Sequence, residues 1–318
     1  MNIFLKFIID SLAFGATFIY GSTGEIITEK SGHLNLGIPG IMCMGGAGGC
    51  LILNMIGKSS LPHALIVLLG ILSSFLFAAL MGLIYSFLTV TLRANQNVTG
   101  LALTTFGVGL MKVLMAGLDA NVYLNRPKKY FRFPFAARTD SLQYLGVMFF
   151  LAILVAILAS LILYRTRVGL NLRAVGENPA TADAVGINVT KYKYLATCIG
   201  SGIAGLGGLY YIMDYMGSRE AYLSIEAFGW LSIALVIFAL WRPHMTIFGS
   251  AVFGILFSCG NYLVHVKQLH LTSMAARPIL QMLPYVVTIV VLIFTSIRNK
   301  RENQPPAGLG VNYFREDR

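Results

Sequence analysis

Residues 173–187 form the most distinctive polar segment of this chain, and their types suit a short helix that binds another protein. Asn178 is a favourable N-cap because its side-chain oxygen can accept hydrogen bonds from the first backbone N–H groups of a helix. Pro179 suits the first helical position, where no N–H is needed. Gly186 can end the helix in a left-handed conformation. We therefore predict that residues 176–187 form a short helix that docks on a soluble partner.

The docking prediction also rests on the charges around this segment. The predicted docking residues are Gly176, Glu177, Asn178, Pro179, Ala180, Ala182, Asp183, Gly186 and Ile187. The basic residues that flank or enter the segment are Arg165, Arg167, Arg173, Lys191 and Lys193. Loops rich in Lys and Arg usually stay in the cytoplasm. The loop 165–193 is therefore expected on the cytoplasmic face of a membrane.

Two further segments carry polar groups into hydrophobic runs, where a solute path and plain helix packing are both open interpretations. Residues 35–40 combine an Asn, a Pro and two glycines, which makes a poor regular helix and suits an unwound path lining. Residues 95–106 bring Asn and Thr side chains into a span, although Thr hydroxyls can also bond their own helix backbone. The predicted path residues are Asn35, Pro39, Asn97, Thr99, Thr104, Thr105 and Phe106. Such groups suit a neutral polar solute.

The residue pattern gives little indication of a catalytic site or a metal site. Residues 200–205 match the spacing of a dinucleotide-binding fingerprint, but that fingerprint needs a strand before it and these glycines lie in a hydrophobic run. Close helix packing explains them better. Residues 57–59 end like a phosphate-binding loop, but Ile52 stands where its first glycine is needed. The histidines show no metal-ligand spacing. We therefore predict no catalytic residue, no metal site and no cofactor bound by this chain.

The polar segments must be positioned by a membrane-spanning scaffold. Hydrophobic residues make up 56% of the 318 residues, charged residues only 12%, and the mean hydropathy is +0.72; soluble domains carry roughly 25% charged residues. A spanning helix needs about 20 mostly apolar residues. The candidate spans are 3–21, 34–56, 61–92, 98–117, 142–164, 195–213, 228–241, 247–264 and 279–297. The sequence predicts an all-α polytopic bundle of about nine spans (eight to ten) over residues 1–300, with a cytoplasmic tail at 301–318.

Charge predicts the orientation of these spans. The net charge is +11, but the basic residues are spread over loops, which disfavours nucleic-acid binding. With loop 165–193 and the basic start of the tail both inside, nine spans place the N-terminus outside. The basic loop 118–140 would then lie outside, which opposes this topology, but we give more weight to the two other basic regions. Ionisable residues in or beside spans point to function, and the candidates are Asp10, Glu25, Lys112 and Asp214, each expected near a membrane edge within reach of water.

The same segments carry a family resemblance. Residues 24–42, Gly-Glu-Ile-Ile-Thr-Glu-Lys-Ser-Gly-His-Leu-Asn-Leu-Gly-Ile-Pro-Gly-Ile-Met, resemble a segment of the branched-chain amino acid and simple-sugar class of ABC importer permeases. Residues 174–189 resemble the cytoplasmic loop of that family, and residues 94–103 resemble its nucleoside and simple-sugar permeases. The chain departs from the family pattern at Pro39, where an acidic residue is expected, and at Thr104, where an asparagine is expected.

The resemblance implies one permease subunit of an ATP-driven importer in a bacterial plasma membrane. A second homologous permease subunit would complete the path, and an extracytoplasmic lipoprotein or periplasmic binding protein would deliver the substrate. Partner ATPase subunits would dock on the predicted docking residues and use ATP and Mg, so this chain would not be an enzyme. Nucleosides are the expected substrate, with simple sugars second and branched-chain amino acids third. An ion-coupled secondary transporter and an intramembrane enzyme remain the alternatives, and copurification with an ATPase discriminates against both.

Overall fold

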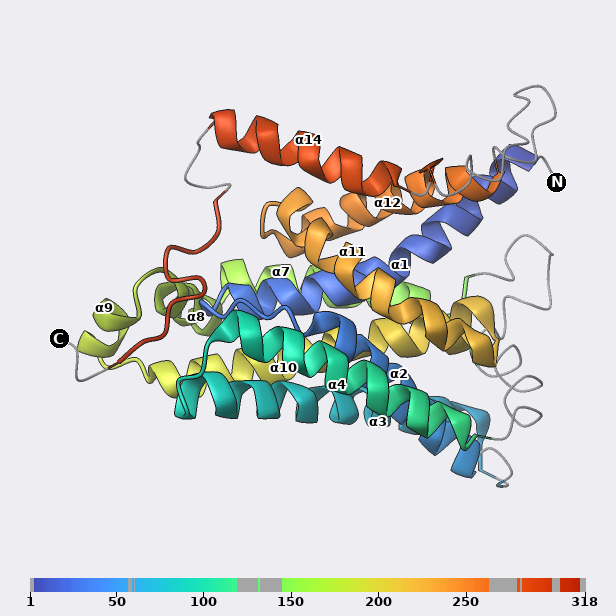
Figure 1. The fold of residues 1–318 in the computed structure, drawn as a ribbon, viewed down its shortest axis with the longest axis horizontal. Coiled ribbons are helices and arrows are strands. Elements are labelled where there is room, and N and C mark those ends of the chain that lie inside the picture. The colour runs from blue at the N-terminus through green and yellow to red at the C-terminus, as the bar shows by residue number, and fades with distance from the viewer. Residues whose placement is uncertain are drawn as a thin grey trace.

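The chain folds into a bundle of helices, and no strand occurs in the described residues (Figure 1). The computed structural model describes residues 3–56, 59, 61–118, 131, 145–262, 279–280, 282–298 and 304–314. The long helices are α1 (Ile3–Glu29), α2 (Ile38–Ile56), α3 (His63–Ser86), α4 (Gln96–Ala116), α7 (Val147–Arg165), α10 (Val189–Leu209), α11 (Ile225–Phe238), α12 (Pro243–Tyr262) and α14 (Leu283–Arg298). Shorter elements are α8 (Arg167–Glu177), α9 (Pro179–Ala184), the π-helical turns η1 (Phe87–Thr91) and η3 (Tyr210–Met216), and the 3₁₀ turn η4 (Arg219–Ser224).

The membrane bundle predicted from composition is confirmed. Within the described residues, 7 helical segments are long and apolar enough to cross a membrane, and Pro243–Cys259 forms a shorter apolar helix. Those segments are Phe4–Glu29, Ile38–Ile56, His63–Thr91, Gln96–Ala116, Val147–Arg165, Val189–Met216 and Glu220–Phe238. Each of the nine hydrophobic runs identified in the sequence overlaps one of the long helices. Because only 7 segments of the described residues are long and apolar enough to span, the predicted count of about nine is approximate.

The two ends of the bundle differ in what they carry. The N-terminus lies at one end, whereas α8, α9 and the C-terminal segment lie together at the other, which we call the α9 end (Figure 1). This agrees with the expectation that loop 165–193 and the tail share one side of the membrane. The opposing basic loop 118–140 lies outside the described residues except at Leu118 and Phe131.

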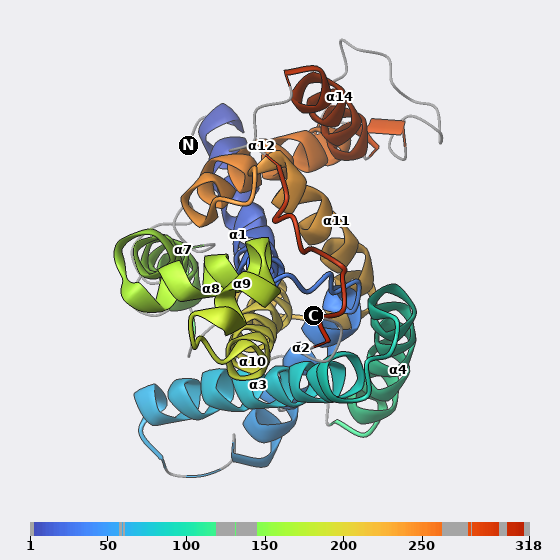
Figure 2. The same cartoon turned by 90° about the vertical axis from the view of Figure 1, so that its left-hand side faces the viewer.

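Helices α2 and α10 form the centre of the bundle, and glycines bring their backbones together. Helix α10 packs on α1, α2 and α3 (Figure 2). A Cβ atom on Gly45 of α2 would lie 2.3 Å from the Cα of Gly205 in α10, and one on Gly24 of α1 would lie 2.2 Å from the carbonyl oxygen of Gly200. The glycines of the apparent dinucleotide fingerprint are therefore helix-packing residues, as predicted.

Three carboxylates lie inside the bundle, and for two of them, Glu25 and Asp214, the expected access to water was wrong. Glu25, Glu29 and Asp214 are at most 3% exposed. Asp214 of η3 accepts a hydrogen bond from the backbone N of Met148 (3.1 Å) and so caps the start of α7. Glu25 accepts one from the backbone N of Asn35 (3.1 Å), and the indole of Trp241 donates to Glu29. Each of these side chains thus accepts at least one hydrogen bond, as buried polar groups generally do.

Candidate functional site

Helix α9 is capped in the way that the sequence predicts. The Asn178 side-chain oxygen accepts a hydrogen bond from the backbone N of Thr181 (3.0 Å), and Pro179 stands in the first turn. Gly186 follows the helix at φ +86°, a conformation that favours glycine. One prediction needs correction: a single helix does not run through 176–187. Gly176 and Glu177 end α8 instead, because the extended backbone of Asn178 (φ −150°) breaks the helix.

Burial divides the predicted docking residues into two groups. Ala182 is only 2% exposed and packs with Val175 and Val189, and Gly176 lies directly against the backbone of Lys30. These two residues hold α9 in place rather than form its surface. Helix α9 instead exposes a face, the α9 face, made of Ala180, Thr181, Ala184 and Val185.

The apolar part of the α9 face was missed in the sequence. The Val185 side chain is 71% exposed, although it lies at the C-cap of a helix and not in a hydrophobic run. The remaining predicted docking residues with exposed side chains or backbone are Glu177, Asn178 and Gly186. Their part in docking stays a prediction.

The C-terminal segment crosses the α9 end and binds it at several points. The Tyr313 hydroxyl donates to the Asp183 carboxylate of α9 (2.9 Å). The backbone N of Gly308 donates to the carbonyl of Gly176 (2.9 Å), and that of Gly310 donates to Gly32 (3.1 Å). This segment, residues 304–314, therefore straps α8, α9 and the α1–α2 connection together. This packing was not predictable from the sequence, because the tail has no hydrophobic periodicity.

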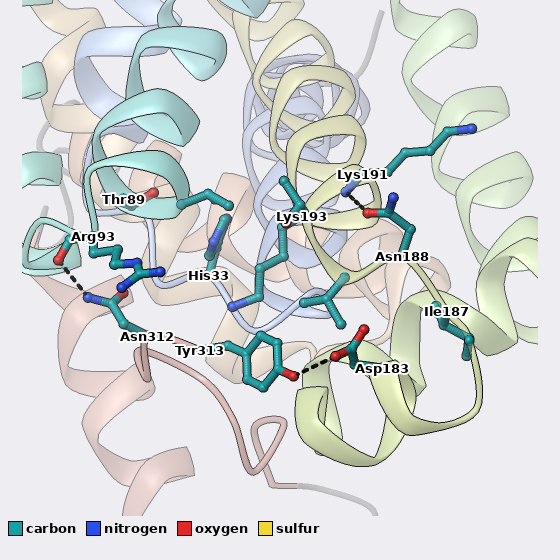
Figure 3. A pocket seen from close by; sticks show the side chains of 14 residues that line it. His33, Thr89, Arg93, Asp183, Ile187, Asn188, Lys191, Lys193, Asn312 and Tyr313 are labelled. Carbon is teal, nitrogen blue, oxygen red and sulfur yellow. Dashed lines mark hydrogen bonds between the residues drawn. The ribbon is translucent and has the colours of Figure 1, made fainter. Parts of the chain in front are cut away.

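A cavity of about 620 Å³, the strap cavity, lies between α9, the start of α10, the end of η1 and the C-terminal segment (Figure 3). His33 and Lys193 line it and are 1% and 4% exposed. Burial, helped by the Lys193 charge, holds the pKa of His33 well below its usual value. The imidazole is therefore neutral at pH 7, and its Nδ1 lies 2.9 Å from the Thr197 hydroxyl.

A second cavity of about 470 Å³ adjoins α8 at the same end. Lys30, Arg173 and Arg242 line it together with one carboxylate, Glu177. Burial lowers the pKa of Lys30, although the nearby Glu177 charge opposes that shift. The Arg173 guanidinium lies 5.0 Å from the centre of the Tyr164 ring. The α9 end is thus rich in positive charge, in agreement with the basic loop of the sequence.

The predicted path residues separate into an inner and an outer set. In the inner set, Asn35 lies in the non-helical connection before α2, where its side-chain oxygen accepts from the backbone N of Gly37 (2.9 Å). Thr104 of α4 donates to the carbonyl of Leu36 (2.9 Å) and so holds this non-helical connection. The predicted unwound segment at 35–40 is therefore confirmed only for residues 35–37, because Pro39 and Gly40 lie in the first turn of α2, where a proline needs no N–H partner. Pro39 packs against Gly229. Thr99 is also buried.

The side chains of the outer set lie on the surface of the bundle. Asn97, Thr105 and Phe106 are exposed on α4, with Phe106 at 54%. The same helix exposes Val98 and Val113. The two sets therefore do not converge on one cavity within the described residues, and their role in a path stays a prediction.

A bundle of apolar helices with an unwound connection and a short capped helix at one end defines a multi-pass membrane protein of the transport class. The chain belongs to the family described as branched-chain amino acid transport system / permease component, whose model matches residues 7–295. This match spans α1 to α14 and confirms the family predicted from the sequence. The chain is therefore a permease subunit of the ABC importer class.

Relatives with named substrates are similar over nearly the whole chain. The nucleoside ABC transporter permease protein NupC of Lactococcus lactis is 31% identical over 96% of this chain and 95% of its own length. The guanosine ABC transporter permease protein NupQ of Bacillus subtilis is 28% identical over 89% of both. A protein of Haloferax volcanii named "Putative glucose ABC transporter permease protein TsgC13" is 31% identical over 92% of both.

Proposed function

We propose that this chain imports nucleosides as one permease subunit of an ATP-driven importer, and that the α9 face docks on the ATPase subunit. The observation that carries the docking proposal is Val185, an apolar side chain that α9 holds 71% exposed beside basic cavities. An apolar residue presented on a capped, anchored helix suits insertion into a partner's groove. ATP and Mg belong to that partner, and the α9 end with its strap faces the cytoplasm of a bacterial cell.

The path forms between this chain and a second, homologous permease subunit. The support for this arrangement is the outward face of α4, where Asn97 and Thr105 stand among apolar side chains. The Thr105 hydroxyl donates to the carbonyl of Leu101 in its own helix (3.2 Å), so the argument rests on Asn97: an amide directed at lipid would be costly, whereas a second permease could cover it. Phe106, on the same face, offers a surface for a nucleobase to stack on. An extracytoplasmic binding protein delivers the substrate at the opposite end of the bundle.

Nucleosides are preferred over sugars for two reasons. The relatives NupC and NupQ are named for nucleosides and match the chain along its length. The glucose-named relative has the same sequence identity to this chain as NupC, 31%. The path residues add amide, hydroxyl and aromatic groups, which suit a neutral solute with a planar base. A simple-sugar permease is the second candidate, supported by that glucose-named relative.

Radiolabelled uptake in a strain lacking this gene tests the substrate. We expect loss of uridine or guanosine uptake, with ribose, glucose and leucine uptake intact, and restoration by the wild-type gene. Intact nucleoside uptake with lost glucose or ribose uptake would contradict the nucleoside assignment and establish the sugar class.

A separate measurement tests the source of energy. We expect uptake to vanish when the partner ATPase is inactivated and to survive collapse of the proton gradient while ATP is maintained. The purified chain alone should hydrolyse no ATP. Transport by the isolated chain in proteoliposomes, driven only by an ion gradient, would instead establish an ion-coupled secondary transporter.

A further inference from the structure

The strap cavity holds a buried lysine for which the described part of the chain supplies no ion pair. Lys193 is 4% exposed, and its side chain points into the middle of the cavity (Figure 3). Among the described residues, no hydrogen bond or ion pair of its ammonium group is found. The ammonium group opens onto the cavity and is not one of the sealed polar atoms that lack a partner. An anion in the cavity would offset the cost of keeping this largely buried charge away from bulk water.

The surroundings of Lys193 add positive potential from two other elements. Arg93 lines the cavity at the end of η1, where its guanidinium carbon lies 4.8 Å from the centre of the Phe314 ring in the strap. The first turn of α10, residues 189–191, also lines the cavity. The Asn188 side chain caps this turn by accepting from the backbone N of Lys191 (2.9 Å), and the N-terminus of a helix of 21 residues keeps a partial positive charge that favours an anion.

One carboxylate opposes this potential. Asp183 of α9 lines the same cavity and accepts the hydrogen bond of Tyr313. His33 adds no charge at pH 7. Three basic residues line the cavity: Lys193 and Arg93 direct their charges toward it, whereas Lys191 lines it at the start of α10 and its ammonium group points away (Figure 3). The cavity therefore keeps an excess of positive charge, with Asp183 at the edge that α9 forms.

We propose that the strap cavity binds a phosphate-bearing anion through Lys193 and Arg93. Its volume of about 620 Å³ lies within the range of about 300–1,000 Å³ typical of small-molecule sites. The phosphate could belong to a soluble phosphomonoester or to an anionic lipid headgroup. An occupant would contact α10, α9 and the strap together, and so would stiffen the helix that docks on the ATPase. This inference does not depend on which solute the permease carries.

Binding to the full-length permease in phosphatidylcholine nanodiscs tests the soluble source, with inorganic phosphate and UMP as probes and uridine as the uncharged control. We expect saturable UMP binding that phosphate displaces and uridine does not. Lys193→Gln should weaken this binding at least about tenfold, because charge-assisted hydrogen bonds to phosphate are lost. Lys191→Gln is the matched control: its ammonium group lies two residues away on the same helix but points away from the cavity, so binding should change less than about twofold (Figure 3).

Asp183→Asn keeps the test independent of any effect of Lys193 on folding. Removing this carboxylate should tighten UMP binding several-fold, because it removes like-charge repulsion. For the lipid source, nanodiscs with phosphatidylglycerol should raise the Tm of the wild type and of Lys191→Gln but not of Lys193→Gln. The proposal is overturned if neither probe binds and phosphatidylglycerol stabilises Lys193→Gln as much as the wild type.

Discussion

The centre of the bundle and its α9 end are built in opposite ways. At the centre, α2 and α10 meet backbone to backbone, so that no Cβ atom fits between Gly45 and Gly205. At the α9 end, a helix of 6 residues is held by separate hydrogen bonds and by one buried side chain, Ala182, and it borders the strap cavity. This difference indicates which part of the permease can move. Closely packed backbones resist displacement, whereas a short helix that is held by a few polar contacts can shift when a partner binds.

The two regions also differ in how a single change should propagate. Where two backbones cross without free space, an added methyl group can be accommodated only if the helices move apart, so both helices are displaced along their length. A hydrogen bond at the α9 end contributes about 0.5–1.5 kcal/mol and touches one helix. We therefore expect global effects from changes at the centre and local effects from changes at the α9 end.

The largest effect is expected at the central crossing. Gly45→Ala places a Cβ 2.3 Å from the Cα of Gly205, with only backbone around it to give way. We expect the purified permease to lose at least about 3 kcal/mol of stability or to fail to assemble, measured as Tm by fluorescence-detected size exclusion. Gly109→Ala is the matched control, since nothing lies within 4 Å of its Cβ in α4. Alanine should be neutral or stabilising there, because it favours a helix more than glycine does. Equal Tm values for the two variants would refute the packing account.

A smaller, local effect is expected when the strap is released from α9. Tyr313→Phe removes the hydroxyl that donates to Asp183 at 2.9 Å. We expect amide hydrogen exchange in residues 179–185 to become several-fold faster, corresponding to about 1 kcal/mol, while the Tm of the bundle stays nearly constant. Tyr192→Phe is the control, because its hydroxyl accepts from Asn171 of α8 and does not contact α9. Unchanged exchange in α9 after Tyr313→Phe would mean that the strap does not hold this helix.

The smallest effect concerns pH. The pKa of His33 is held well below the value of about 6.5 that it has in the unfolded chain, by burial and by Lys193. The unfolded state therefore takes up a proton first, so stability is constant above about pH 7 and falls as the pH drops below about 6.5, by at most about 1.4 kcal/mol per pH unit.

The variant His33→Asn isolates this contribution, because it keeps a polar atom near the Thr197 hydroxyl without a titrating ring. The wild type should lose a few degrees more in Tm than the variant between pH 7.5 and pH 5.5. A difference between the two proteins that stays constant over this range would show that His33 is not held neutral.

Local features were predictable from the sequence where the residues act on their own backbone. Asn178, Pro179 and Gly186 specify the cap, the start and the exit of α9 through their intrinsic chemistry. The apolar runs specify the spans in the same way. The unwound segment expected at residues 35–40 was only partly predictable: residues 35–37 are non-helical, but Pro39 and Gly40 lie at the start of α2, because a proline is tolerated in the first turn of a helix.

The remaining features depend on contacts between segments distant in sequence. The burial of Glu25 and Asp214 arises because Asn35 and Met148 supply backbone N–H partners from other elements. The strap binds through residues such as Gly308, whose partner Gly176 lies in α8. The strap cavity likewise joins four elements around Lys193, which in the sequence is one basic loop residue among several. No local pattern encodes such pairings.

The most direct test of the coupling role of the α9 end is the Val185→Glu variant in the assembled importer, with binding protein and ATPase, in proteoliposomes. Its control is Val168→Glu, which alters a similarly exposed valine (59% against 71%) at the start of α8, outside the α9 face. We predict that Val185→Glu lowers both uridine uptake and substrate-stimulated ATP hydrolysis at least about tenfold, because a charge would be buried in the partner's groove, whereas Val168→Glu retains both. Wild-type uptake and hydrolysis in Val185→Glu would contradict the account.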